Sequence, residues 1–285
     1  MGMQINTNIS ALNVSRNLNQ TQNAMTKSLE RLSTGLRINR AADDAAGLTI
    51  SEGLKSQIGG LAVAGRNAQD GISVIQTAEG ALTEVQSILN RMRDLGVQAS
   101  NDSNNTDSRT AIKTEVDELS NELNRIVAST NFNGTKLLDG TAGTAGVMSF
   151  QVGAGSGEEN TISVNMANIG DKLGGAMAAT AEAGSTLTFD TAANAKTSIA
   201  AIDDALKAVS TQRSELGAKQ NRLESAANTI ATSAENLTAA RSRITDTDMA
   251  AEMANFTRSQ VLSQAGTAML SQANQSSQAV LQLLR

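Results

Sequence analysis

The sequence predicts a mainly α protein, an elongated antiparallel helical bundle or coiled coil with paired terminal helices and a small β-hairpin cap. The 285 residues include no Pro and only four Phe, which favours long uninterrupted helices over a compact core rich in aromatics. Apolar residues between 199 and 244 recur at heptad spacing, and such a seam needs a partner helix to bury it. The two ends of the chain share a composition rich in Asn, Gln and Ser, so we expect the two segments to become ordered by packing together.

The heptad segment 199–244 is the longest regular pattern in the chain. At 1.5 Å per residue it forms a rod of roughly 70 Å, longer than an ordinary globular domain is wide. We therefore expect helices around 54–95 and 112–126 to lie along it. Its expected seam is Ile199, Ile202, Leu206, Val209, Arg213, Leu216, Gln220, Leu223, Ala227, Ile230, Ala234, Leu237, Arg241 and Ile244.

The terminal segments predict two amphipathic helices with few charges, and most of the stability of such helices comes from their partners. Gly35 is a natural end for the first helix, and the TDTD sequence at 245–248 offers N-caps for the last one. The last helix needs burial on several sides, as packing between subunits provides. The apolar positions are Ile5, Ile9, Leu12, Leu18, Met25, Leu29 and Leu32 in the first helix and Met253, Phe256, Leu262, Leu270, Leu281 and Leu284 in the last.

Between the ends, apolar residues at helical spacing predict one helix around 54–95 and a second around 112–126, separated by the turn NDSNNTD. Asp43 or Asp44 is the expected N-cap of the first of these helices. Six glycines fall between residues 53 and 80, and each costs roughly 1 kcal/mol relative to Ala in a helix interior. Because the heptad phase persists across them, we expect them to allow close helix packing.

The segment after the NFNG turn changes to Gly, Ala, Ser and Thr. Apolar residues alternate over 147–152 and 162–166 around a Gly-rich loop, which predicts a β-hairpin. Leu187 and Phe189 are candidates for a short third strand.

Composition excludes several functions. Without Cys or His the chain lacks disulfides, most transition-metal ligands and the commonest general base, so we expect no metal and no cofactor. A net charge of −5 without a basic, aromatic stripe argues against nucleic acid. No segment reaches the ~18 apolar residues of a membrane span, and residues 1–10 lack the apolar core of a signal peptide.

Several heptad helices, polar uncharged termini and the lack of a compact core favour a self-assembling structural protein over two other classes. A coiled-coil signalling rod predicts a membrane anchor and a Glu-rich surface, which the sequence lacks. An enzyme would have to use the pair Asp43–Asp44 as catalytic carboxylates, and a helix cap with a solvated neighbour explains that pair better. We therefore expect no enzymatic activity.

Several long motifs resemble bacterial flagellin. They are MQINTNISALN at the start, ERLSTGLRINRAADDAAGLTIS at 30–51, RNAQDGISVIQTAEGAL at 66–82, NRMRDLGVQASN at 90–101, TNFNGTKLLDG at 130–140 and the closing SQANQSSQAVLQLLR. The segment 141–196 resembles only the short cap of compact flagellins.

This resemblance implies a structural subunit that self-assembles into the helical flagellar filament and serves motility. It implies an inner coiled-coil domain of residues 1–43 and 246–285, an outer rod of 44–140 and 193–245, and a hairpin cap of 141–192. The linker between inner and outer domains would contain Gly35, Arg37, Asn39, Asp43 and Asp44.

The resemblance also implies location and partners. The chain would be extracellular, exported by the flagellar type III route without a cleaved signal peptide. Its partners would be copies of itself, a flagellar export chaperone, and hook-associated and filament-cap proteins. The same apolar residues of the last helix suit a chaperone groove and filament packing alike.

A further implied partner is the vertebrate Toll-like receptor for flagellin. The matching positions are Arg91, Leu95, Gln98 and Glu115, whereas Asn90 and Gly96 replace residues often seen beside them. In the alternative interpretation, Leu95 packs in the rod while Arg91 and Arg93 are solvated or pair with Asp94 and Glu115. Both can hold, because this surface is also used between subunits.

Overall fold

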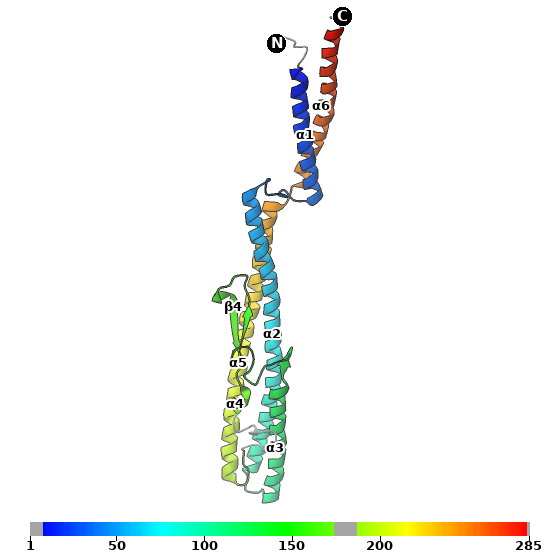
Figure 1. Cartoon of the computed structure of the whole chain (residues 1–285). Helices are drawn as coiled ribbons and strands as arrows, with labels where there is room; N and C mark the ends of the chain where they lie inside the picture. Colours follow the sequence, from blue (N-terminus) through cyan, green and yellow to red (C-terminus); the bar gives the residue numbers. More distant parts are fainter. Residues whose placement is uncertain (1–7, 174–186, 284–285) are drawn as a thin grey trace. The chain divides into compact units, whose positions relative to one another are not determined.

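The computed structural model describes residues 8–173 and 187–283, and the chain divides into two compact units. The first unit is Met1–Ser56 with Asn236–Arg285, and the second is Gln57–Glu235. Figure 1 shows the elements along the chain. In chain order they are α1 (Ile9–Thr34), α2 (Ala45–Ala99), α3 (Thr106–Ser129), β1 (Asn131–Phe132), β2 (Thr135–Lys136), β3 (Val147–Gln151), the 3₁₀ helix η1 (Glu158–Asn160), β4 (Thr161–Asn165), α4 (Ile169–Leu173), α5 (Ala192–Thr245) and α6 (Met249–Leu283). The predicted fold class is confirmed: long helices dominate, and the strands form small antiparallel pairs.

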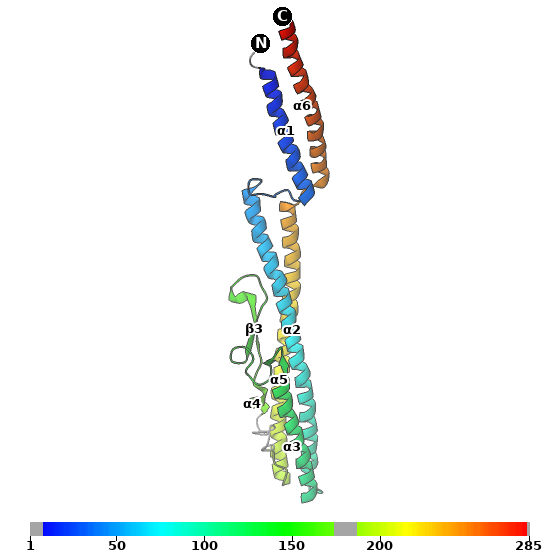
Figure 2. The ribbon, with the colours of Figure 1, turned by 45° about the vertical axis from the view of Figure 1, so that its right-hand side comes forward.

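In the first unit, α1 and α6 lie side by side and run antiparallel (Figure 2). The side-chain amide of Asn8 donates to the carbonyl of Ala273 at 3.0 Å. Towards the other end of the pair, Arg31 and Glu252 approach to 3.6 Å. The expected pairing of the terminal helices is therefore present in this unit.

Local capping sets the ends of these helices as the sequence predicted. Gly35 ends α1 in the left-handed conformation, with φ +72°, and its N–H donates to the carbonyl of Arg31 at 2.8 Å. Of the two candidate caps for α2, Asp44 is the one used, because its side chain accepts from the N–H of Gly47 at 2.8 Å. Asp248 does the same for α6 by accepting from the N–H of Ala250 at 2.9 Å.

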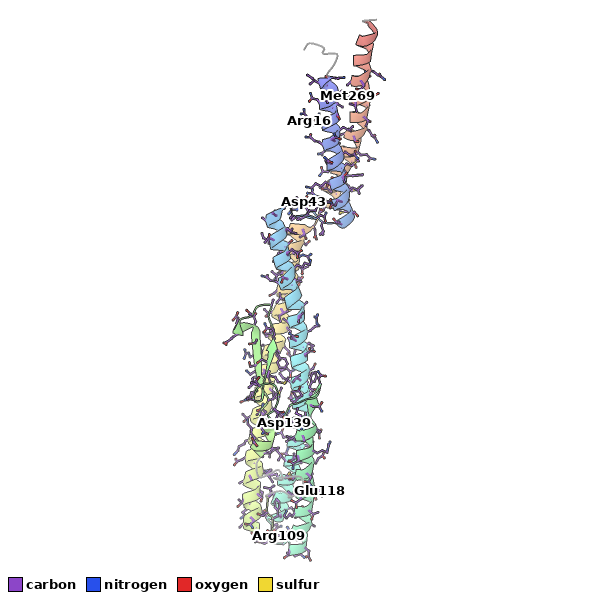
Figure 3. The ribbon with its side chains drawn as sticks, in the orientation of Figure 1. Arg16, Asp43, Arg109, Glu118, Asp139 and Met269 are labelled. Atoms are coloured by element: carbon purple, nitrogen blue, oxygen red, sulfur yellow. The ribbon has the colours of Figure 1, made fainter. Side chains whose placement is uncertain are left out.

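In the second unit, α2 and α5 pack closely through glycines of α2. A Cβ built on Gly71 would lie 3.1 Å from Leu223, and one on Gly96 would lie 2.9 Å from Ile199. The core continues into α3 and the segment after it, and its largest fully buried side chains include Ile75, Leu82, Leu89, Met92, Leu123, Leu137, Leu138, Met166, Ile169, Leu173, Phe189 and Ile202. At the start of α3, Arg109 donates to the backbone carbonyls of Asp190 and Asn101 (Figure 3).

The glycines of α2 do not all serve close packing. Gly60 and Gly71 do, since an added Cβ would lie 2.8 Å from Ala154 and 3.1 Å from Phe150 respectively. Gly53, Gly59 and Gly80 have nothing within 4 Å of an added Cβ. For these three glycines the expectation of close packing is wrong, because their positions on the helix face open space.

The predicted hairpin is present as β3 paired with β4, with Phe150 opposite Ile162. A shorter hairpin, β1 with β2, turns at Asn133 and Gly134, whose φ angles are +48° and +81°. The expected third strand is wrong, because Leu187 and Phe189 lie outside the strands of the described chain. They are buried instead, 3% and 0% exposed, and the Phe189 ring lies 3.4 Å from a Cβ built on Gly96.

The seam of α5 differs from the expected one at alternate positions. Ile202, Val209, Leu216, Leu223 and Ile230 are buried as predicted. Between them, however, the buried residues are Ser198, Ala205 and Gln212 rather than Ile199, Leu206 and Arg213. Contact with the β3–β4 hairpin explains why Gln212 is buried in place of Arg213. The Gln212 amide donates to the carbonyl of Asn165 in β4 at 2.9 Å.

Candidate assembly and recognition surfaces

The inner pair α1–α6 buries a regular seam of modest side chains. On α6 the least exposed residues, up to residue 275, are Glu252, Phe256, Ser259, Ser263, Gly266, Leu270 and Ala273. On α1 the same spacing gives Ala11, Val14, Leu18, Thr21, Met25, Ser28 and Leu32. Both sets follow the alternating three- and four-residue spacing of a coiled coil. Many members are small or polar, so this seam buries little apolar area for its length.

The large apolar side chains of the inner pair are mostly on its outside. They are Ile9, Leu12 and Leu29 on α1 and Met249, Met253, Val261, Leu262 and Met269 on α6, with exposures from 47% to 61%. Met269, labelled in Figure 3, is 60% exposed. Apolar patches of this kind on a soluble protein mark interaction surfaces.

The predicted inner-domain residues therefore fall into two groups. Leu18, Met25, Leu32, Phe256 and Leu270 are partly buried in the pair. Ile9, Leu12, Leu29, Met253 and Leu262 are exposed. Ile5, Leu284 and the side chain of Leu281 lie outside the described residues.

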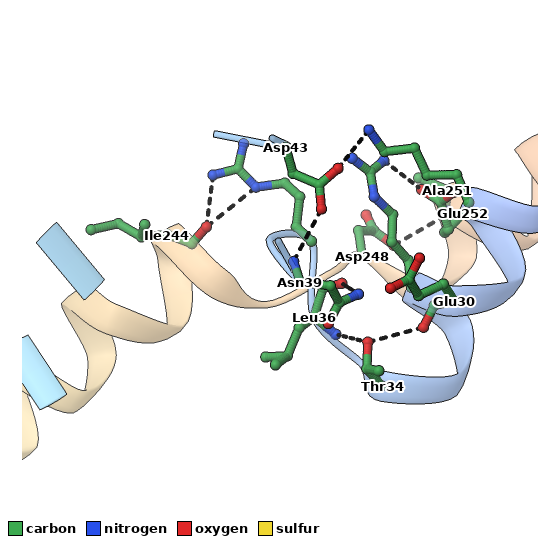
Figure 4. A network of polar contacts seen from close by, with 12 residues as sticks. Glu30, Thr34, Leu36, Asn39, Asp43, Ile244, Asp248, Ala251 and Glu252 are labelled. Carbon is green, nitrogen blue, oxygen red and sulfur yellow. Dashed lines mark hydrogen bonds and ion pairs between the residues drawn. The ribbon is translucent and has the colours of Figure 1, made fainter. Parts of the chain in front are cut away.

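Two short connecting segments of the first unit cross and bond to each other (Figure 4). Leu36 and Asp246 form an antiparallel bridge. Beside it, the N–H of Arg37 donates to the carbonyl of Thr245 at 2.6 Å, and the N–H of Thr247 donates to the carbonyl of Gly35 at 3.0 Å. The Arg37 guanidinium also donates to the carbonyl of Ile244 at 2.7 Å. A cation thus satisfies a carbonyl in the last turn of α5, where the helix dipole favours positive charge.

Asp43 holds the linker against α1. Its carboxylate pairs with Lys27 at 2.6 Å and accepts from the backbone N–H groups of Asn39 and Arg40, each at 3.2 Å (Figure 4). The Lys27 hydrogen bond, reinforced by these backbone donors, lowers the pKa of Asp43 from 3.8 to about 2. Arg40 continues the contact by pairing with Glu30 at 3.1 Å. Arg37, Asn39, Asp43 and Asp44 thus all have structural partners.

The candidate receptor residues lie in the second unit on α2 and α3. Arg91 and Glu115 pair across these helices at 2.7 Å, and their side chains are 58% and 45% exposed. Gln98 is exposed one turn beyond Leu95. Leu95 itself is only 3% exposed and belongs to the core. Arg91, Gln98 and Glu115 are therefore at the surface, whereas Leu95 supports them from beneath.

Two polar residues with clear structural roles escaped the sequence reasoning. Gln212 is buried where Arg213 was expected, and Glu252 is buried in the seam of α6. The available signal for Glu252 was its place four residues before an apolar seam position, Phe256, and its heptad spacing to Ser259. Arg31, its ion-pair partner, is next to a predicted seam residue, Leu32.

The carboxylates of residues 8–173 and 187–283 do not gather into a metal site. There is no group of three or more Asp or Glu side chains in that part of the chain able to hold a metal ion. Within the same residues, none of the helices has the combined length and hydropathy needed to cross a bilayer.

Known proteins match both halves of this architecture. Residues 5–143 match the bacterial flagellin N-terminal helical region, and residues 199–284 match the bacterial flagellin C-terminal helical region. A flagellin of Halalkalibacterium halodurans is 52% identical over 283 residues, covering 99% of this chain and 100% of the relative. A flagellin of Bacillus subtilis is 48% identical over 307 residues, with coverage of 99% and 100%.

The fold of a putative flagellar hook-associated protein from Vibrio parahaemolyticus is also similar. Its structure matches 72% of this chain and 100% of its own, at 19% identity and a TM-score of 0.56.

Paired terminal helices with outward apolar side chains are typical of a helical structural protein that carries an interaction surface on these helices. The chain belongs to the bacterial flagellin family, in a compact form with the N-terminal and C-terminal helical regions. It is a structural subunit of the flagellar filament that serves motility, and it is not an enzyme. Its flagellin relatives form the extracellular flagellar filament.

Proposed function

We propose that the α1–α6 pair is the part of the subunit that polymerises and that its outward apolar side chains contact neighbouring copies. The observation that carries this proposal is the exposure, from 47% to 61%, of eight large apolar side chains on these two helices. Contacts between non-identical surfaces of successive copies generate open helical polymers when the rotation between copies does not close into a ring. Burial of Leu or Met side chains in such contacts supplies about 1.5–3 kcal/mol each.

The domain division that goes with this role has an inner domain of residues 1–43 and 246–285. The outer rod comprises 44–140 and 193–245, and the hairpin cap comprises 141–192. Gly35 and Asp248, which end α1 and begin α6, support the inner boundaries. The crossing segments between them suit a linker.

The assembly proposal is tested by changing Leu262 and Met269 together to Gln. The double variant should need at least tenfold more protein to polymerise when filaments are induced by salt, because each substitution removes apolar area that becomes buried on assembly. Sedimentation and negative-stain microscopy measure the effect. Gln264→Ala, an exposed polar change on the same helix, is the control. An unchanged critical concentration in the double variant would contradict the proposed contacts, and globular particles alone from the natural chain would contradict polymerisation itself.

We further propose that the flagellin-sensing Toll-like receptor recognises the monomer through Arg91, Gln98 and Glu115. The supporting observation is that Arg91 and Glu115 are paired, exposed and on adjacent helices. Their ion pair orients the guanidinium before any partner binds, and preorganisation reduces the entropy cost of association. Leu95 contributes by packing beneath them.

A reporter-cell assay tests this recognition. Arg91→Ala and Gln98→Ala should each reduce potency by tenfold or more, whereas Arg125→Ala, which removes an exposed ion pair with Glu122 on α3, should leave it unchanged. Leu95→Ala is a less clean probe, because the cavity it leaves destabilises the fold by about 2–5 kcal/mol. An unaltered response to Arg91→Ala would argue against these contacts.

The remaining proposed partners act before and after assembly. We propose that a flagellar export chaperone binds the apolar residues of α6 in a groove. We also propose that the type III route exports the chain without cleavage. Hook-associated and filament-cap proteins would then contact the ends of the polymer. Met253→Gln with Leu262→Gln should abolish co-elution with the chaperone, and continued co-elution would reject this site. Mass spectrometry of filament protein should show an uncleaved N-terminal segment.

A further inference from the structure

Contacts at three positions along the α1–α6 pair hold the two helices in one alignment. Asn8 bonds to the carbonyl of Ala273, as described above. Further along, a Cβ built on Gly266 would lie 3.2 Å from Leu18 Cδ1, so the two helices approach closely there. Arg31 and Glu252 form the third contact. All three contacts belong to one antiparallel register.

Most of the seam specifies this register weakly. A heptad seam repeats every seven residues, so sliding one helix by a heptad again places seam residues against seam residues. Small or uncharged side chains such as Ala11, Thr21, Ser263 and Ala273 tolerate that exchange. Serine, threonine and alanine at these positions cannot provide the size complementarity that fixes a packed core.

Glu252 is the exception, because it is the one charged residue among the α6 seam positions of the described chain. It is 7% exposed, and its partner Arg31 comes from α1. Removing one member of a buried pair leaves an uncompensated buried charge, which is strongly unfavourable. Buried polar groups in coiled-coil seams are known to fix register at a cost in stability.

A slipped register would separate this pair. One heptad earlier on α1, the position of Arg31 is occupied by Ala24, and one heptad later lies beyond the end of α1 at Thr34. The displacement of facing residues would be about 10 Å. No other residue of α1 seven positions away can therefore substitute for the Arg31 guanidinium.

We propose that the Arg31–Glu252 ion pair is the positioning contact that selects the register of α1 against α6. By fixing that register it sets where the exposed apolar side chains of one helix stand relative to those of the other. The consequence for polymerisation rests on the proposed assembly role of these side chains.

The natural absence of Cys makes the register measurable by disulfide trapping. A Cβ built on Gly266 lies 3.9 Å from the Cβ of Leu18, within the ~3.5–4.5 Å span of disulfides, so Leu18→Cys with Gly266→Cys reports the observed register. Leu18→Cys with Ser259→Cys, or with Ala273→Cys, reports a slip of one heptad in either direction. Oxidised glutathione accepts the two electrons, and mass spectrometry of the dissociated chain counts intramolecular disulfides.

In filaments of the otherwise natural chain, the Gly266 reporter should close at least tenfold more than either slip reporter. Arg31→Met or Glu252→Gln should raise a slip reporter at least tenfold, and Arg31→Glu combined with Glu252→Arg should restore the natural pattern. Arg40→Met removes the exposed pair with Glu30 and should change nothing.

An unchanged disulfide pattern in Arg31→Met and Glu252→Gln would overturn the proposal. If either single variant fails to polymerise, the charge-reversed double variant decides: restored filaments with the Gly266 disulfide support the ion pair, and absent filaments overturn it. Failure of the natural chain to polymerise would instead count against the assembly proposal, and the same reporters in the soluble chain would still read the register.

Discussion

At the scale of single residues, two glycines of α2 that look alike in sequence have opposite surroundings. A Cβ on Gly71 would lie 3.1 Å from both Leu223 and Phe150, whereas Gly80 has nothing within 4 Å. Gly71→Ala should therefore destabilise the monomer by about 1–3 kcal/mol through overpacking. Gly80→Ala should stabilise it by about 1 kcal/mol, because Ala loses less backbone entropy in a helix. Denaturant unfolding measures both, and effects of the same sign would contradict the packing.

Asp43 gives a second prediction at this scale. Its pKa of about 2 is below the ordinary 3.8, so its contribution to stability is fully present above about pH 4 and is lost as the pH falls towards 2. Because Lys27 is the main cause, Lys27→Met should move the pKa of Asp43 back towards 3.8. Carboxyl carbon chemical shifts followed through an acid titration measure it. Lys55→Met, which removes an exposed pair with Glu52, should leave the pKa of Asp43 unmoved.

At the scale of elements, Gln212 connects α5 to the hairpin. Its amide donates to Asn165 in β4, and its side-chain oxygen lies 3.5 Å from the ammonium of Lys172 in α4. Gln212→Ala should destabilise the second unit by about 0.5–1.5 kcal/mol, because it removes the hydrogen bond that a buried side chain of α5 makes to β4. Gln220→Ala, which removes only a bond to Glu224 on the same helix, should cost much less. Thermal unfolding compares the two, and equal losses would show that β4 does not depend on this contact.

The same elements show what sequence could predict. The helix ends could be predicted from the sequence, because Gly35 and Asp44 cap their helices through local backbone conformation and hydrogen bonding. The buried face of α5 could be predicted only in part from the sequence. Heptad spacing assumes one partner helix, whereas α5 also contacts the β3–β4 hairpin. Whether Gln212 or Arg213 is buried depends on an acceptor, the Asn165 carbonyl, that is distant in sequence.

The candidate sites show a similar limit. Resemblance to flagellins located Arg91 and Glu115, and the structure adds that they form an ion pair. Exposure could not be read from the same motif, since Leu95 and Gln98 differ only by one turn of the helix yet one is buried and the other exposed. Arg31 and Glu252 were hidden because nothing local relates the two ends of the chain.

At the scale of the whole molecule, the absence of His leaves no side chain with an ordinary pKa between pH 5 and 8. The free energy of unfolding should therefore be nearly constant between about pH 6 and 8. Below about pH 4 it should fall, because hydrogen bonds from Ser242 and Thr141 lower the pKa of Asp246 and of Asp139 respectively. Melting temperatures across this range check the prediction, and a step near pH 6.5 would contradict it.

The crossing of the two connecting segments has a mechanical consequence for a subunit of a rotating filament. The chain leaves α1 and enters α6 through neighbouring strands bonded at Leu36 and Asp246, with flanking bonds at Gly35 and Arg37. Tension carried along either segment is shared with the other through hydrogen bonds that lie across the strands. Moving one connection away from the other therefore requires these hydrogen bonds to break.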